Sequence, residues 1–196
     1  MFPETPAAAA ALSVATRHCS PALLNHCVRS YLWGAMYGKA HGITFDDELY
    51  YVSALLHDMG LTEAFDSHRV PFEAAGGQLA WVFGTAAGWP ADRAARVEKN
   101  IVSHMREDVS PDVDAEAHLL QVATSWEVVG RRPEEFPPEA CAEVLARYPR
   151  RGFGPEFLVC FTDQARRKPG SAAAASVDND VAGRIAANPL DGGPRR

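Results

Sequence analysis

Residues 54–60 read Ala54-Leu55-Leu56-His57-Asp58-Met59-Gly60, an apolar helical run that ends in an imidazole beside a carboxylate. The leucines must face a core, and His57 and Asp58 lie about 100° apart on a helix of 3.6 residues per turn. Near a helix end both side chains can still reach one point in a cleft. A buried His–Asp pair costs free energy unless it is paired or bound to a cation. The stretch therefore points to a cation site beside the core.

A divalent metal at this point would need a third protein ligand. Such metals accept imidazole nitrogen and carboxylate oxygen together. His26 is the candidate, because it lies on an earlier amphipathic segment with apolar residues in helical spacing. The competing interpretation is a solvated surface pair, since a His–Asp dipeptide often arises by chance. The residue pattern alone leaves both interpretations open.

Helix signals dominate the rest of the chain, and strand signals are scarce. Ser20-Pro21 is a cap followed by proline at the first helical position, and Gly60 follows the His57-Asp58 pair as a stop. We expect an all-α bundle of about six to eight helices in a domain spanning residues 1–169. Residues 170–196 are predicted to be a polar, mobile tail with one short helix near 181–187. The expected helices lie near residues 6–18, 20–38, 44–57, 71–84, 90–104, 115–129, 139–147 and 155–167.

Composition narrows the classes of partner. The 196 residues are 47% hydrophobic and carry a formal net charge of −6, which argues against binding to nucleic acid or an anionic membrane. A small anionic substrate stays open, because one pocket can be locally positive. No apolar run reaches the length of a membrane span and no signal peptide is visible, so we expect a cytoplasmic protein. The four cysteines form no C-x-x-C motif, which is typical of buried packing residues in a reducing compartment.

The order His26, His57-Asp58 and a later carboxylate resembles the HD-domain superfamily of metal-dependent hydrolases. Within it, the flanking sequence is similar to the cyanamide hydratase branch, over roughly residues 20–169. The resemblance implies an HD-domain helical bundle, a small-molecule substrate and one divalent metal, with Zn²⁺ the first choice and Fe²⁺ or Mn²⁺ the alternatives. The segments that carry it are residues 26–31, 48–61, 71–76, 101–104 and 166–169.

The resemblance also implies a fourth ligand, and here the chain departs from the family. The family has an aspartate before a short Val-Val-Gly-like stretch, whereas this chain has Glu127 before Val128-Val129-Gly130. Glutamate is a legitimate oxygen ligand but is one methylene longer, so it could shift the metal or meet it through a water. The alternative is that Glu127 is only a surface acid. The neighbouring Trp126 is bulkier than expected and either packs or narrows the pocket.

Three further residues are candidates for catalytic roles. His104 could donate a proton, because its ordinary pKa is near 6.5; the alternative is a buried core histidine. Arg29 lies one helical turn after His26 and could orient a carboxylate or a substrate, or form a buried structural ion pair. Glu73 could hydrogen-bond a ligating histidine, or simply favour the start of a helix.

These features predict metal-dependent hydration of a small nitrile-like substrate, such as cyanamide to urea, by a metal-activated water. The first alternative is a phosphohydrolase acting on a nucleotide or phosphate ester, which favours several cations near the phosphate. The second is a binding module that keeps a metal for structure or has lost it. A homo-oligomer is compatible with the sequence.

Overall fold

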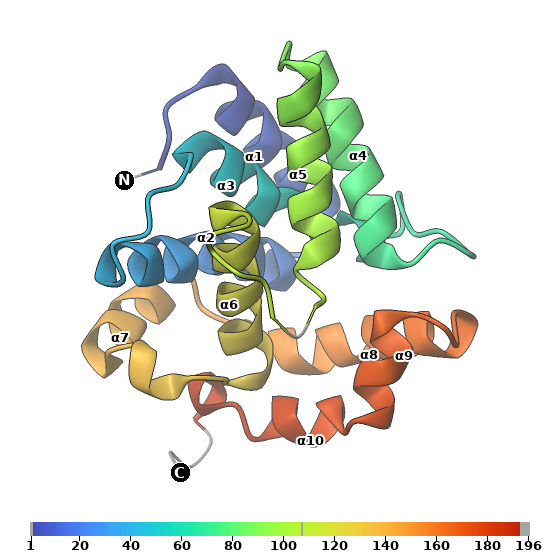
Figure 1. The fold of residues 1–196 in the computed structure, drawn as a ribbon. Coiled ribbons are helices and arrows are strands. Elements are labelled where there is room, and N and C mark those ends of the chain that lie inside the picture. The colour runs from blue at the N-terminus through green and yellow to red at the C-terminus, as the bar shows by residue number, and fades with distance from the viewer. Residues whose placement is uncertain (1, 107, 193–196) are drawn as a thin grey trace.

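The computed structural model describes residues 2–106 and 108–192, which form α-helices and short 3₁₀ segments with no strand among them (Figure 1). This confirms the predicted all-α fold. The helices are α1 (Pro6–His18), α2 (Pro21–Ala40), α3 (Asp47–Leu56), α4 (Phe72–Ala86), α5 (Ala91–Ser103), α6 (Ala115–Val129), α7 (Pro138–Arg147), α8 (Phe153–Arg167), α9 (Ala172–Asp178) and α10 (Val181–Ala186), with 3₁₀ turns η1 (Met59–Leu61), η2 (Pro133–Glu135) and η3 (Pro189–Asp191).

Local capping explains where several helices begin. The side chains of Thr5, Ser20, Asp46, Asp114 and Ser171 each accept a hydrogen bond from a backbone N–H in the first turn of the helix that follows. Such caps satisfy amides that have no partner within the helix. The boundaries of α1, α2, α3 and α6 are therefore encoded locally, and the sequence predicted them closely.

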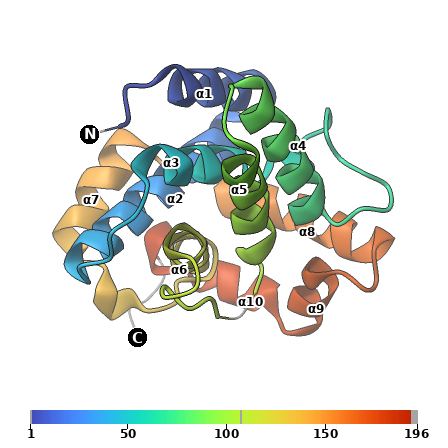
Figure 2. The same cartoon turned by 45° about the horizontal axis from the view of Figure 1, so that its top comes forward.

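The main core lies where α2, α3, α5 and α6 meet. Figures 1 and 2 show α4 and α5 side by side, and Figure 1 shows α8, α9 and α10 at the other end of the molecule. Fully buried side chains such as Leu55, Leu56, Ile101, Leu119 and Leu120 fill the main core. The two leucines before His57 thus face the core, as the sequence predicted.

A second, smaller core joins the C-terminal helices to the body. It contains Phe153, Phe157 and Phe161 of α8 together with Val181 and Ile185 of α10, all of them buried. The prediction of a mobile tail from residue 170 needs correction for residues 171–192, because α9 and α10 pack on this aromatic surface. Residues 193–196 of that tail lie outside the described residues.

The helix count is corrected for the same reason. Among residues 2–106 and 108–192 there are ten α-helices rather than six to eight, and the additions are α9 and α10. The short helix expected near residues 181–187 is α10, whereas α9 in the alanine run was not expected. The division at residue 169 stays a prediction.

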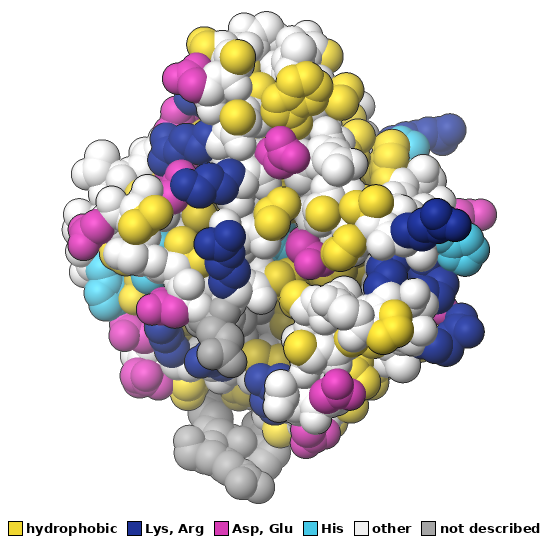
Figure 3. Space-filling view, turned by 45° about the vertical axis from the view of Figure 1, so that its right-hand side comes forward, with side chains coloured by type: hydrophobic (Ala, Val, Ile, Leu, Met, Phe, Trp, Pro, Cys, Tyr) yellow, Lys and Arg dark blue, Asp and Glu magenta, His cyan; other side chains and the backbone are white. Residues whose placement is uncertain are grey.

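The face drawn in Figure 3 carries both polar and apolar side chains. Figure 3 shows hydrophobic side chains gathered over the outer ends of α4 and α5, where Trp81 is 43% and Val82 is 56% exposed. Elsewhere on this face acidic and basic side chains are interspersed. No helix in the described part of the chain is long and apolar enough to cross a membrane.

Candidate metal centre

His57 and Asp58 lie in a tight turn directly after α3, which ends at Leu56. Two glycines allow this turn to approach α4. A Cβ on Gly60 would lie 2.1 Å from the carbonyl oxygen of Phe72, and one on Gly76 would lie 2.9 Å from the carbonyl oxygen of His57. Close backbone approach of this kind excludes larger residues. Gly60 therefore does more than end the helix, because it lets the turn pack against α4.

Three side-chain atoms meet at this turn. Nε2 of His26 lies 3.1 Å from Nε2 of His57, and each of these nitrogens lies 3.3 Å from Oδ2 of Asp58. All three residues are buried, and His26 comes from the second turn of α2. The predicted convergence of these residues is confirmed, and the interpretation as a solvated surface pair is wrong.

Hydrogen bonding leaves the three meeting atoms as acceptors. Nδ1 of His57 donates to the carbonyl of Ala54 at 2.8 Å, so its Nε2 keeps a lone pair. Nδ1 of His26 faces a Glu127 oxygen at 3.6 Å, which favours the proton on that nitrogen and a lone pair on Nε2. Oδ2 of Asp58 is buried without a hydrogen-bond donor among the described residues. With this placement of protons, three buried acceptor atoms lie in contact, and a shared cation would satisfy all three.

The spacing of these atoms fits a divalent metal. Zinc bonds of about 2.0–2.1 Å at tetrahedral angles place neighbouring ligand atoms roughly 3.3 Å apart, and the three observed separations are 3.1, 3.3 and 3.3 Å. His26, His57 and Asp58 form a buried group able to hold a metal ion. Three protein ligands leave a position open for water or substrate, as in catalytic metal sites.

The mutual electrostatic interaction of His57 and Asp58 favours the charged form of each side chain. Burial by itself would lower the pKa of the His57 imidazole, but the Asp58 carboxylate outweighs it and raises that pKa. Burial by itself would raise the pKa of Asp58, but His57 and His26 hold it well below its ordinary value. The carboxylate is therefore ionised and available as an oxygen ligand.

Glu127 is not brought into this group. Its Oε1 accepts hydrogen bonds from Nη2 of Arg29 at 2.5 Å and from Nη1 of Arg150 at 2.7 Å, and its Oε2 accepts one from Nε1 of Trp33 at 2.6 Å. The carboxylate faces Nδ1 of His26, on the far side of the ring from the three meeting atoms. The Glu127 side chain thus lies behind the ring of His26 and not beside the three meeting atoms.

Arg29 is the partner of Glu127 and points away from the meeting atoms. It is fully buried, and its Nη1 also donates to the carbonyls of Tyr148 and Pro149. Although burial opposes ionisation, the guanidinium of Arg29 holds the pKa of Glu127 far below its ordinary value. Of the two interpretations of Arg29, the structure places it in a buried ion pair that orients a carboxylate.

His104 lies beside the candidate centre. Its ring meets the His57 ring edge-on, with centroids 5.0 Å apart, and its Nδ1 donates to the carbonyl of Ile101. Burial, with a further contribution from His57, lowers the pKa of His104 to about 4. His104 is therefore neutral at pH 7 with a lone pair on Nε2. This nitrogen can accept a proton, and it can donate one only after it has accepted it.

Glu73 does not make the contact expected of it. It is buried in the first turn of α4, and its Oε2 has no hydrogen-bond partner among the described residues. The ring N–H of His57 is not available to it, because Nδ1 of His57 donates to the carbonyl of Ala54. Burial raises the pKa of Glu73.

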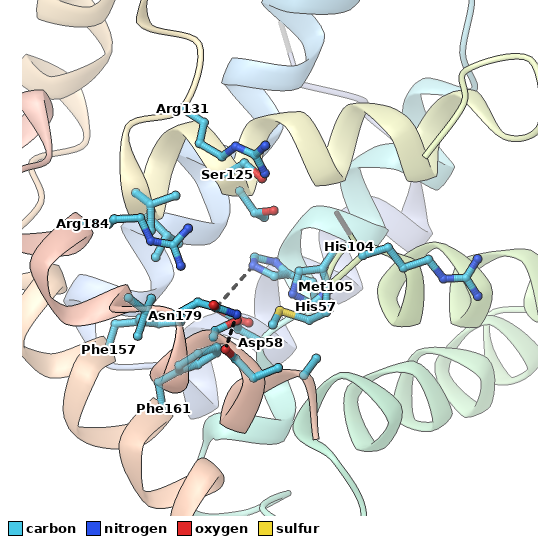
Figure 4. A pocket seen from close by; sticks show the side chains of 18 of the residues that line it. His57, Asp58, His104, Met105, Ser125, Arg131, Phe157, Phe161, Asn179 and Arg184 are labelled. Carbon is cyan, nitrogen blue, oxygen red and sulfur yellow. Dashed lines mark hydrogen bonds and ion pairs between the residues drawn. The ribbon is translucent and has the colours of Figure 1, made fainter. Parts of the chain in front are cut away.

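The candidate centre opens into a cavity of about 330 Å³. His26, His57, Asp58 and His104 lie at its base, and Phe157 and Phe161 of α8 form an apolar wall (Figure 4). Sequence reasoning missed the polar residues of the other walls, because they follow no motif: Ser125, Arg131, Ser176, Asn179 and Arg184.

The chain is similar to yeast cyanamide hydratases. The proteins named cyanamide hydratase DDI2 and cyanamide hydratase DDI3 from Saccharomyces cerevisiae are each 25% identical to it over 160 residues. The matched region covers 79% of this chain and 71% of each yeast protein. No protein-family model matches the chain, so its place in the wider HD-domain superfamily stays a prediction.

Proposed function

We propose that this protein is a metal-dependent hydratase that adds water to a small nitrile-like molecule such as cyanamide. The observation that carries the proposal is the buried triangle of two imidazole nitrogens and one carboxylate oxygen, with sides of 3.1–3.3 Å. Its position at the base of a cavity of about 330 Å³ suits a small molecule. The similarity to the yeast hydratases supports the reaction class.

His26, His57 and Asp58 would hold the metal, and Zn²⁺ suits a site of two imidazoles and one carboxylate. A divalent ion held there would lower the pKa of a bound water toward ~7 and would polarise the nitrile group. Glu127 fixes the ring of His26, because a carboxylate behind a ligating imidazole sets its tautomer and orientation. The aromatic wall of Phe157 and Phe161 limits access of bulk water.

His104 carries the proton transfers in this proposal. As oxygen from water bonds to the nitrile carbon, Nε2 of His104 takes the proton that the water loses. The same nitrogen then gives this proton to the nitrile nitrogen, where negative charge develops. The product is an imidic acid, which tautomerises to an amide; from cyanamide that amide is urea. Every atom of the water enters the product.

A substrate panel on the purified full-length chain tests the proposal. Cyanamide and small neutral nitriles are expected to yield urea or the corresponding amides, with His57→Ala and Asp58→Ala inactive and the exposed-loop variant His68→Ala fully active. His68 is exposed and does not line the cavity, which makes it a matched control. Full turnover by either His57→Ala or Asp58→Ala contradicts the proposal.

A second candidate function is a phosphohydrolase, and one observation favours it. Arg131 and Arg184 line the same cavity, and guanidinium groups bind phosphate well. The same panel separates the two, because nucleotides and phosphate esters would release inorganic phosphate, whereas hydration releases none.

A further inference from the structure

The side chains that line the cavity are mainly basic, whereas the whole chain is acidic. The sequence carries a formal net charge of −6, yet Asp58 is the only acidic residue among the described residues that line the cavity. Three arginines line it as well, Arg106, Arg131 and Arg184. A cation bound at the candidate metal centre would neutralise Asp58, and the other charged side chains of the lining are the three arginines.

Two of these arginines, Arg131 and Arg184, have no acidic partner among residues 2–106 and 108–192. In the described part of the chain, no side-chain hydrogen bond or ion pair involves the guanidinium of Arg131 or Arg184. By contrast, the arginines that brace the fold are paired, such as Arg29 and Arg150 with Glu127. Arg131 and Arg184 are therefore free to bind a charged ligand.

The two side chains reach the cavity from different elements. Arg131 follows Gly130, the left-handed residue (φ 67°) that ends α6, and Arg184 lies on α10. Figure 4 shows the guanidinium of Arg184 pointing toward the middle of the cavity and that of Arg131 beside Ser125 on the α6 side. A ligand in the cavity could contact both arginines at one end and the candidate centre at the other.

A neutral molecule such as cyanamide gives such a pair of guanidinium groups nothing to bind as an ion. A carboxylate or phosphate accepts charge-assisted hydrogen bonds from arginine, often two at a time. We propose that the natural substrate carries an anionic group that Arg131 and Arg184 bind, while its reacting end lies at His26, His57 and Asp58. The identity of the reacting end rests on the proposed function.

A matched pair of nitriles provides the kinetic test. Cyanoacetate and cyanoacetamide have similar size, but only the first is an anion. The wild-type chain is expected to hydrate cyanoacetate with at least a tenfold higher kcat/KM. Arg131→Gln and Arg184→Gln should each lower that value about tenfold, the scale of one charge-assisted hydrogen bond, and leave cyanoacetamide unchanged. Arg17→Gln, on the exposed side of α1, is the control.

Calorimetric titration of the full-length chain with cyanoacetate and with inorganic phosphate separates this inference from the hydratase proposal. Anion binding that Arg131→Gln and Arg184→Gln weaken, without any hydration, supports the inference and contradicts the hydratase. Tighter binding of phosphate, together with phosphate-ester hydrolysis, makes phosphate the natural anionic group. Anion binding that neither variant changes, or equal kcat/KM for the two nitriles, overturns the inference.

Discussion

The two ring nitrogens of His26 face different partners. Nε2 meets His57 and Asp58 at 3.1 and 3.3 Å, while Nδ1 faces the carboxylate of Glu127 at 3.6 Å. The ring also stacks on Phe153, with centroids 4.2 Å apart. These contacts fix the orientation of the His26 ring from three sides. A substitution of Glu127, which lies behind the ring, should therefore change metal binding at the candidate centre.

Replacing Glu127 with glutamine should weaken metal binding without removing any atom of the candidate ligands. The amide keeps the size of the side chain but loses the charge behind His26, and such changes typically cost ten- to a hundredfold in metal affinity. Competition with a chelator measures the affinity. Glu139→Gln, at an exposed position on α7, is the control. Unchanged affinity in Glu127→Gln would show that Glu127 does not position His26.

Glu127→Ala should destabilise the fold. It would leave Arg29 and Arg150 buried without their shared carboxylate, and breaking a buried pair in this way costs about 3–5 kcal/mol. Urea denaturation of the variant and wild type gives the difference in the free energy of unfolding. A loss below 1 kcal/mol would mean that the two guanidinium groups find other partners.

Glu73→Gln should stabilise the protein at pH 7 and have little effect at pH 3.5. Burial raises the pKa of Glu73, so the folded state holds its proton more tightly than the unfolded state. The ionised side chain therefore destabilises the fold once the pH rises above its ordinary pKa. Melting temperatures of both proteins at the two pH values measure the effect. A lower melting temperature of the variant at pH 7 would indicate a favourable partner for the carboxylate.

Among the elements, those with local signals could be predicted from the sequence. Side-chain caps mark the starts of α2 and α3, and the leucines before His57 show which face of α3 is buried. The α9 and α10 helices have 7 and 6 residues, lengths that are unstable in isolation. Their stability comes from packing on α8, a contact that no local pattern reveals.

The residues of the candidate site also differ in how well the sequence predicts them. His26, His57 and Asp58 were predictable because their order follows a known pattern. The orientation of Glu127 was not, because Arg150 lies 23 residues further along the chain and Arg29 lies 98 residues earlier. Both become partners of Glu127 only in the folded protein.

Deleting residues 171–196 should impair the cavity as well as the fold. The deletion removes the lining supplied by α9 and α10 and exposes the aromatic surface of α8 that Val181 and Ile185 cover. We expect a lower melting temperature and loss of substrate binding. The milder Ile185→Ala, which should cost about 2–5 kcal/mol, checks the packing without removing Arg184. Wild-type stability in Ile185→Ala would contradict the role given to the second core.

Across the whole molecule, the C-terminal segment is connected to the candidate centre. Arg150 pairs with Asp191 of η3 as well as with Glu127, and the side chain of Asn188 donates to the carbonyl of Glu127 at 3.0 Å. Glu127 in turn faces His26. Residues of the C-terminal segment therefore help to hold Glu127, and through it His26, at the buried site.

Metal analysis of the purified full-length chain tests the central claim most directly. The wild-type protein and His68→Ala should each contain about one divalent metal per chain, and His57→Ala should contain almost none. A wild-type content far below one after gentle purification, or a content that His57→Ala leaves unchanged, would contradict a metal held by His26, His57 and Asp58.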